Sequence, residues 1–248
     1  MGVALIAGAG PGIGGAVAKL FASKGFQVCV ARRNGGKLAP LVQAIQSNGG
    51  QCEGFSCDFR SEDSVKHLVH EVEERYGGID IGVHNIGANI GHVPICSTTT
   101  RKFTKIWEMA ALSAFLFGRE LANKMETKGA GCIIFTGATA STRGGAGFSA
   151  FSSAKMAKRA LAQSMARELG PKGIHVAHVI IDGVVNNPNT EEFFSNQSEE
   201  FKLRFSKMAS SAGLLEPDDV AEAFWWIYNQ PKSTWTHELD LRPWSEKW

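Results

Sequence analysis

Short runs of β-branched and apolar residues alternate along the chain with longer segments of helical periodicity. This alternation constrains the fold more than any other feature, because strands separated by helices form parallel sheets. In the segment 61–76, for example, Val65, Leu68, Val69 and Val72 recur at helical spacing and charged residues fill the other face. Strands are predicted at 3–7, 27–31, 51–56, 79–85, 132–136, 175–181 and 237–241.

Right-handed crossovers wind such elements into a Rossmann-type, doubly wound α/β fold, with helices on both faces and a ligand crevice at the carboxyl ends of the strands. The 248 residues, 44% hydrophobic and 20% charged, suit a single dinucleotide-binding domain over residues 1–248. The polar stretch 186–215 is interpreted as a pair of substrate-lid helices, although its apolar residues could also simply pack onto the domain. These residues are Phe193, Phe194, Phe201, Phe205 and Met208.

Charge and composition disfavour several classes of partner. A formal net charge of +2 gives no strong field for nucleic acid or an anionic membrane, and no apolar run approaches the roughly 20 residues that span a bilayer. The cysteines are odd in number, five, and lack CxxC spacing, and the histidines form no i, i+4 pair, so we expect neither a disulfide framework nor a metal site. Because no secretory leader is recognisable, the protein is expected in the cytoplasm.

A glycine-rich loop, Gly8–Gly14, follows the first predicted strand and opens a helix. In this context glycines let the backbone approach a pyrophosphate at the positive end of the helix, which predicts cofactor contacts from Gly8, Gly12, Ile13 and Gly14. The spacing also fits the usual fingerprint shifted onto Gly10, Gly12 and Gly15. The alternative is a glycine-rich turn that binds nothing.

Two arginines, Arg32 and Arg33, end the second predicted strand. An acid at this place would bond the ribose 2′-hydroxyl of NAD, whereas a guanidinium binds a 2′-phosphate. The pair therefore favours NADP(H) over NAD(H). The alternative is that both arginines are simply solvated.

Taken in order, the glycine loop, Asn85-Ile86-Gly87, Lys155 and the segment 166–183 resemble the short-chain dehydrogenase/reductase family over essentially the whole chain. The resemblance implies a seven-stranded sheet in the order 3-2-1-4-5-6-7. It also implies a homodimer or homotetramer built from helices near 103–125 and 152–169. By the same resemblance, the cofactor contacts include Asp58, Phe59, Asn85, Gly87, Lys155 and Val184.

The chain departs from the family at its catalytic residues. Family members reduce carbonyls or oxidise alcohols with an Asn, Ser, Tyr and Lys set, in which the tyrosine exchanges a proton with the substrate. Here Lys155 matches, but Phe151, Ala138 and Ala111 occupy the positions of the tyrosine, serine and asparagine. A phenyl ring carries no transferable proton.

The nicotinamide end of the predicted site departs from the family as well. The family's Pro-Gly after the sixth strand is Asp182-Gly183 here, and the threonine that follows it is Asn187. Loss of a positioned general acid alone typically forfeits about 10²- to 10⁴-fold in rate. Turnover by the family's usual route is therefore not expected.

Three functional hypotheses remain. The first is a divergent NADP(H)-dependent oxidoreductase of a small, apolar carbonyl or alcohol, with Lys155 retained and the proton supplied by Ser141, Thr139 or a bound water. The second is a pseudoenzyme that binds NADP(H) for regulation or structure. The third is a non-redox enzyme, such as a lyase or isomerase, that reuses the crevice, because a fold does not fix its function.

Overall fold

The computed structural model describes residues 1–87, 91–195, 199–211 and 213–246. Its strands are β1 Val3–Ala7, β2 Gln27–Arg32, β3 Gln51–Ser56, β4 Ile81–His84, β5 Gly131–Thr136, β6 Ile174–Ile181 and β7 Glu238–Leu241. Its helices are α1 Ile13–Ser23, α2 Ala39–Ser47, α3 Glu62–Tyr76, α4 Thr100–Trp107, α5 Ser113–Lys128, α6 Ser149–Leu169, α7 Pro188–Ser195, α8 Glu199–Ser210 and α9 Pro217–Tyr228. The predicted strands are all present, and the fourth is the one whose ends differ most from the prediction.

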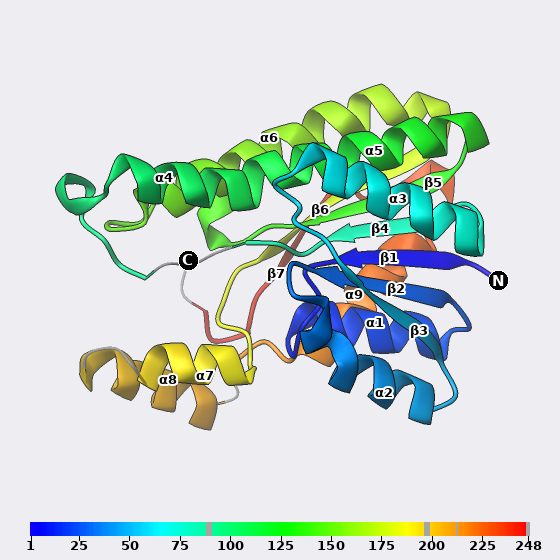
Figure 1. Cartoon of the computed structure of the whole chain (residues 1–248). Helices are drawn as coiled ribbons and strands as arrows, with labels where there is room; N and C mark the ends of the chain where they lie inside the picture. Colours follow the sequence, from blue (N-terminus) through cyan, green and yellow to red (C-terminus); the bar gives the residue numbers. More distant parts are fainter. Residues whose placement is uncertain (88–90, 196–198, 212, 247–248) are drawn as a thin grey trace.

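All of the strand pairs are parallel, and the sheet order is β3-β2-β1-β4-β5-β6-β7, which confirms the predicted topology. Helices α3, α5 and α6 cover one face of the sheet, and α1, α2 and α9 cover the other (Figure 1). The carboxyl ends of the strands meet at one edge of the molecule. The loops that could bind a ligand are therefore gathered at that edge.

Each face of the sheet has its own hydrophobic core. On the α3 side, Val65, Leu68, Val69 and Val72 are buried, as their spacing predicted. On the other side, α1 and α9 meet through edge-to-face rings, with Phe21 and Trp225 centroids 5.2 Å apart. Full burial of one such side chain stabilises a fold by about 1.5–3 kcal/mol, so the sheet that carries the site is rigidly held.

Helices α7 and α8 lie outside the two helical layers, beside the carboxyl edge of the sheet (Figure 1). They occupy the predicted segment 186–215 and contact each other through the stacked rings of Phe194 and Phe205, whose centroids are 4.9 Å apart. The predicted side chains of Phe193 and Phe201 lie outside the described residues. The pair is thus placed where it can border a site.

Within the described ranges, no helix is long and apolar enough to cross a membrane. The same residues contain no cluster of three or more His, Cys, Asp or Glu side chains that could hold a metal ion.

Candidate functional site

The glycine loop between β1 and α1 is shaped by backbone crowding that excludes side chains. Gly8 has φ +84°, and a Cβ there would lie 2.9 Å from the Asn85 carbonyl oxygen. A Cβ on Gly14 would lie 2.8 Å from the Gly8 carbonyl oxygen. Because both contacts are too short for any other residue, the loop can turn tightly and leave the start of α1 open to a ligand.

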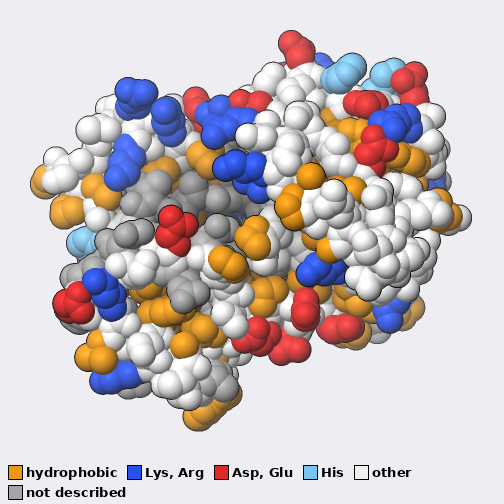
Figure 2. Space-filling view, turned by 60° about the horizontal axis from the view of Figure 1, so that its bottom comes forward, with side chains coloured by type: hydrophobic (Ala, Val, Ile, Leu, Met, Phe, Trp, Pro, Cys, Tyr) orange, Lys and Arg blue, Asp and Glu red, His pale blue; other side chains and the backbone are white. Residues whose placement is uncertain are grey.

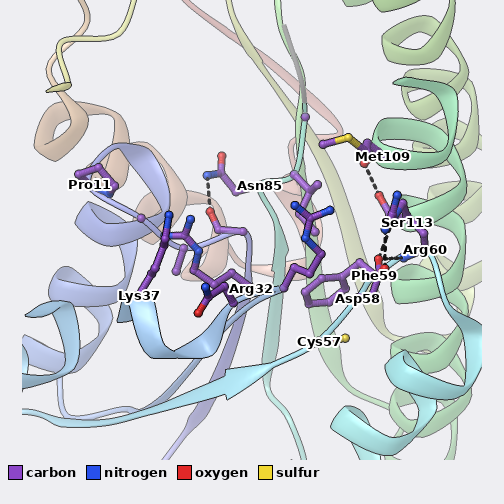
Figure 3. A pocket seen from close by; sticks show the side chains of 17 residues that line it. Pro11, Arg32, Lys37, Cys57, Asp58, Phe59, Arg60, Asn85, Met109 and Ser113 are labelled. Carbon is purple, nitrogen blue, oxygen red and sulfur yellow. Dashed lines mark hydrogen bonds and ion pairs between the residues drawn. The ribbon is translucent and has the colours of Figure 1, made fainter. Parts of the chain in front are cut away.

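A cavity of about 560 Å³ opens above this loop, between the segments that follow β1, β2, β3 and β4. We call this cavity the nucleotide pocket. Figure 3 shows Arg32 and Lys37 on one side of it, Asn85 behind, and Ser113 on the far side. Among the predicted cofactor contacts, Gly8, Arg32, Arg33, Asp58, Phe59, Asn85 and Gly87 line this cavity.

The remaining predicted contacts lie elsewhere. Gly12 caps α1, and Gly14 lies in its first turn, where its Cα packs against the glycine loop. Ile13 and Val184 line a second, adjoining region instead. The structure thus places Ile13 and Val184 at a second cavity, and Gly12 and Gly14 at the start of α1.

The β2 end of the nucleotide pocket is basic. Arg32, Arg33 and Lys37 all line it, and Lys37 comes from a 3-10 turn, Gly35–Leu38. This turn is fastened to β3 because the Gly35 amide donates to Ser56 Oγ at 3.1 Å. Sequence reasoning missed Lys37, although a third basic residue in the same short loop was available as a signal.

Asp58 lies at the end of the pocket that follows β3. Arg60 forms an ion pair with it, Nη2 to Oδ2 at 2.6 Å, and also donates Nε to Oδ1 at 2.9 Å. The hydrogen bond from the Arg60 side chain is the main reason that the pKa of Asp58 falls below its ordinary value. The carboxylate is therefore ionised and already partly satisfied.

Lys155, from α6, lies behind the wall of the nucleotide pocket. It is 5% exposed, and its Nζ donates to the carbonyl oxygens of Thr136 at 3.1 Å and Gly137 at 3.4 Å. A Cβ on Gly87 would lie 3.1 Å from this Nζ, so glycine at this position lets Lys155 lie close against the pocket wall. Burial lowers the pKa of Lys155 to about 8.

The second cavity, of about 640 Å³, lies beyond the nucleotide pocket and is lined by both Phe151 and Ala138. The Phe151 ring faces Lys155, whose Nζ is 5.6 Å from the ring centroid. Ala111 is buried in a π-helical segment, Glu108–Leu112, that joins α4 to α5. Of the three residues predicted to depart from the family's catalytic set, two therefore place apolar side chains on the cavity and the third lies inside the helical layer.

Asp182 is a buried charge at the end of β6, with 1% of its side chain exposed. It accepts hydrogen bonds from Thr139 Oγ1 at 2.5 Å and from Arg143 at 3.1 and 3.2 Å, and Arg242 Nη2 lies 3.3 Å away. Desolvation opposes its ionisation, but these hydrogen bonds and the two guanidinium charges outweigh it and lower the pKa of Asp182. This ion cluster joins the loop after β5 to the ends of β6 and β7.

The two hydroxyls considered as proton donors occupy different places. Ser141 is 1% exposed, is absent from the lining of the second cavity, and accepts the Ala138 amide at 3.1 Å through its Oγ. Thr139 does line the cavity, but its hydroxyl proton is donated to Asp182. Asn187, at the family's threonine position, donates Nδ2 to Thr190 Oγ1 at 2.7 Å.

Three buried polar groups near the nucleotide pocket were not found from the sequence. Lys158 is fully buried, and its Nζ donates to the Ile86 carbonyl oxygen at 2.7 Å. His84 Nε2 lies 3.0 Å from Ser113 Oγ, which in turn donates to the Met109 carbonyl oxygen at 2.5 Å. Lys158 occupies a position typical of an exposed helix surface, and His84 and Ser113 stand alone among apolar residues, so no sequence pattern marked them as a buried polar group.

A doubly wound sheet with a glycine loop at its switch point defines a dinucleotide-binding protein. Residues 2–198 match the family model described as short chain dehydrogenase. The chain therefore belongs to the short-chain dehydrogenase/reductase family, a family of oxidoreductases that bind nicotinamide cofactors.

Three solved structures illustrate the likeness. A short-chain dehydrogenase from Rhodopseudomonas palustris is 44% identical, with 98% of each chain covered and a TM-score of 0.80. A 7 alpha-hydroxysteroid dehydrogenase complexed with NADH and 7-oxo glycochenodeoxycholic acid is 28% identical, covering 97% of this chain and 92% of that chain, with a TM-score of 0.86. An actinorhodin polyketide ketoreductase variant with NADPH shares the fold at 24% identity, covering 98% and 96%, with a TM-score of 0.88.

Proposed function

We propose that the protein is an NADP(H)-dependent oxidoreductase that acts on a carbonyl or alcohol through a non-standard proton donor. The observation that carries the cofactor choice is the cluster of Arg32, Arg33 and Lys37 at the β2 end of the nucleotide pocket. The segment 32–38 contains no acid that would repel a phosphate. Guanidinium and ammonium groups bind phosphate through charge-assisted hydrogen bonds, which are about twice as strong as neutral ones.

The residues present fit this cofactor along the whole crevice. Gly8–Gly14 would hold the pyrophosphate at the start of α1, and Arg32, Arg33 and Lys37 the 2′-phosphate. Asp58 and Phe59 would border the adenine, and Asn85, Gly87, Lys155 and Val184 would lie toward the nicotinamide. The bound cofactor would supply or accept the hydride.

The first experiment is a calorimetric titration of the protein with NADPH and, in parallel, with NADH. We expect NADPH to bind at least tenfold more tightly, because only it offers a 2′-phosphate to the basic cluster. Equal affinities would remove the preference for NADP(H). Binding of neither would contradict both the oxidoreductase and the pseudoenzyme.

The proton donor is the part of the chemistry that Phe151 does not supply. Ser141 does not line the second cavity, and Thr139 lines it but donates its own proton to Asp182, so a water held by Thr139 is a stronger candidate than either hydroxyl. Since the Thr139 hydroxyl already donates to Asp182, its oxygen presents lone pairs to a ligand. Thr139 can therefore accept from an alcohol or from a water held beside it.

A pseudoenzyme that binds NADP(H) is the second candidate, and a specific observation favours it. Phe151 and Ala138 place apolar groups on the cavity where the family carries a phenol and a hydroxyl. This candidate predicts tight NADPH binding without NADPH oxidation across a panel of aldehydes, ketones and diketones. Oxidation that depends on one of these compounds would favour the enzyme instead.

An apolar substrate is favoured by the lining of the second cavity, where rings and aliphatic groups surround few charges. Ile13, Phe148 and Phe151 come from the domain, and Phe194 and Met208 come from α7 and α8. In Figure 2, hydrophobic and basic side chains lie near the centre of the face, together with an acidic one. We interpret α7 and α8 as the lid over this substrate.

A neutral fluorescent probe, N-phenyl-1-naphthylamine, tests the apolar site without knowledge of the substrate. We expect Phe194→Asp to weaken its binding at least tenfold. Leu203→Asp is the matched control, because Leu203 is 57% exposed on α8 and should leave binding unchanged. Equal effects of the two variants would contradict a cavity walled by Phe194.

A homodimer or homotetramer is supported by exposed apolar side chains on three neighbouring helices. Phe103 and Trp107 on α4, Phe115 on α5 and Met156 on α6 are 39–42% exposed. Light scattering on Trp107→Glu and Phe115→Glu tests this, and we expect a smaller mass than for the unaltered protein. An unchanged mass would exclude these helices from the subunit contact.

A further inference from the structure

Two lysines of α6 bring their amino groups to one backbone carbonyl inside the protein. Lys155 Nζ donates to the Thr136 carbonyl oxygen at 3.1 Å, and Lys158 Nζ donates to the same oxygen at 3.4 Å. Lys158 is completely buried and Lys155 is 5% exposed. Among the residues that the structure describes, neither lysine forms an ion pair. A second ammonium at this place would therefore lack a compensating charge.

In the described part of the chain, the titratable groups that face this pair offer no free carboxylate. His84 on β4 and His178 on β6 are both fully buried. The nearby acid, Glu238 on β7, accepts Arg159 at 2.7 and 2.5 Å and lies 3.1 Å from His178 Nδ1. Since Glu238 is already committed to Arg159, protonation of both lysines would leave two adjacent buried charges uncompensated.

We propose that Lys155 and Lys158 share one positive charge, and that Lys158 is the neutral partner whose amine positions the Asn85–Gly87 wall of the nucleotide pocket. The contacts of the two lysines assign them these different roles. Lys158 reaches the Ile86 carbonyl oxygen at 2.7 Å and so joins the loop after β4 to the end of β5. Lys155 stands directly behind Gly87, next to the pocket.

The direction of both titrations agrees with this division. Burial first, and then the charge of Lys155, lower the pKa of Lys158 well below its ordinary value. Burial alone lowers the pKa of Lys155, to about 8. The amine that loses its proton first is therefore the deeper one, which touches Ile86.

The consequence for the cofactor rests on the proposed function. An anionic cofactor bound against Gly87 would stabilise the charged form of Lys155. Where free Lys155 is partly deprotonated, near pH 8, binding should take up protons. Lys158 is thus a positioning residue, and Lys155 is the group that couples the pocket to pH.

The first test needs no cofactor: the melting temperature of the unaltered protein and of Lys158→Met is measured from pH 6 to pH 10. A lysine whose folded pKa is depressed contributes stability that grows as pH rises from that folded pKa toward its unfolded value, near 10.4. Relative to the Met variant, the unaltered protein should therefore gain about 2–4 °C across this range. Lys105→Met, on the surface of α4, should show a difference that does not change with pH.

A pH-independent difference for Lys158→Met would overturn the shared charge. Because this test uses no NADPH, its result does not depend on whether the proposed function is correct. If Lys158→Met fails to fold, Lys158→Gln, which keeps a neutral N–H donor, provides the same comparison.

The second test is a calorimetric titration with NADPH at pH 8 in phosphate and in Tris, whose ionisation enthalpies differ. Proton uptake should appear as a difference between the two observed enthalpies, and Lys155→Met should abolish it. Equal enthalpies in the two buffers for the unaltered protein would overturn the coupling. A failure of NADPH to bind would contradict the proposed function and the coupling, but not the shared charge seen in the melting temperatures.

Discussion

The nucleotide pocket and the second cavity occupy neighbouring parts of one crevice, yet they differ in how far they match the family pattern expected from the sequence. The pocket keeps its glycine loop, its basic β2 end and the Asn85 wall. The second cavity carries Phe151 and Ala138, and a buried aspartate stands at the end of β6 beside it. The segments after β1 to β4 line the nucleotide pocket, whereas the segments after β5 and β6 line most of the second cavity. Substitutions in the second cavity can therefore alter the chemistry while the nucleotide pocket keeps the residues that bind the cofactor.

The largest effect should come from rebuilding the family's catalytic residues in the second cavity. We expect Phe151→Tyr combined with Ala138→Ser and Ala111→Asn to raise NADPH-dependent reduction of a diketone such as phenanthrenequinone by about 10²- to 10⁴-fold. The measurement is kcat/KM, with NADPH affinity as the control. No gain, with NADPH still bound, would show that the cavity no longer places a substrate against the restored groups.

The nucleotide pocket should respond to loss of its basic cluster. Replacing both Arg32 and Arg33 by alanine removes charge-assisted hydrogen bonds of about 1.5–3 kcal/mol, so NADPH affinity should fall about 10- to 100-fold. NADH affinity should change little. Arg101→Ala, an exposed arginine on α4, is the matched control. An equal loss for NADPH and NADH would mean that these arginines do not read the 2′-phosphate.

The contribution of the Asp182 ion cluster to the free energy of unfolding should depend on pH. Asp182→Asn should lower the free energy of unfolding by about 1–3 kcal/mol at pH 7, because Arg143 and Arg242 then lose a buried partner. Since the folded pKa of Asp182 is depressed, this stability is present above the unfolded pKa of about 3.9 and lost as pH falls through the folded pKa. Urea unfolding at pH 7 and pH 3 measures it. A difference that persists unchanged at pH 3 would contradict an ionised Asp182.

The smallest expected effect is the loss of stability on removing the Ser141 hydroxyl, and comparison with Thr139 distinguishes the roles of the two hydroxyls. Ser141→Ala removes one hydrogen bond to the Ala138 amide and should cost about 1 kcal/mol of stability, while any carbonyl reduction continues. Thr139→Val should lower that activity more than Ser141→Ala does. If Ser141→Ala folds normally and abolishes reduction, Ser141 rather than Thr139 acts on the proton.

The periodicity of the sequence was sufficient to predict the strands and a parallel, doubly wound sheet, while the strand order and several residues of the nucleotide pocket came from the resemblance to the short-chain dehydrogenase/reductase family. Gly8, Arg32 and Asn85 lie at the carboxyl ends of successive parallel strands, and a parallel sheet brings such ends together. Each of these residues follows a strand that is recognisable in the sequence, and the carboxyl ends of parallel strands lie at one edge of the sheet.

The buried polar network could not be predicted in the same way. Lys158 resembles a surface residue of an amphipathic helix in the sequence, and only the packing of α6 on β5 and β6 brings it to Ile86 and Thr136. Asp182 was recognised as a departure, but its partners Thr139, Arg143 and Arg242 come from distant segments. Pairings of this kind depend on tertiary distances that no spacing in the sequence encodes.

The Asp182 cluster has a consequence for how sequences of this kind can vary. A proline at position 182 would carry no charge, so position 143 would not need a basic residue to pair with it. With an aspartate there, loss of Arg143 would leave a buried carboxylate short of one of its two guanidinium partners, which costs stability. Among close relatives we therefore expect positions 143 and 182 to change together, so that covariation between them marks the chains that have remodelled this end of the crevice.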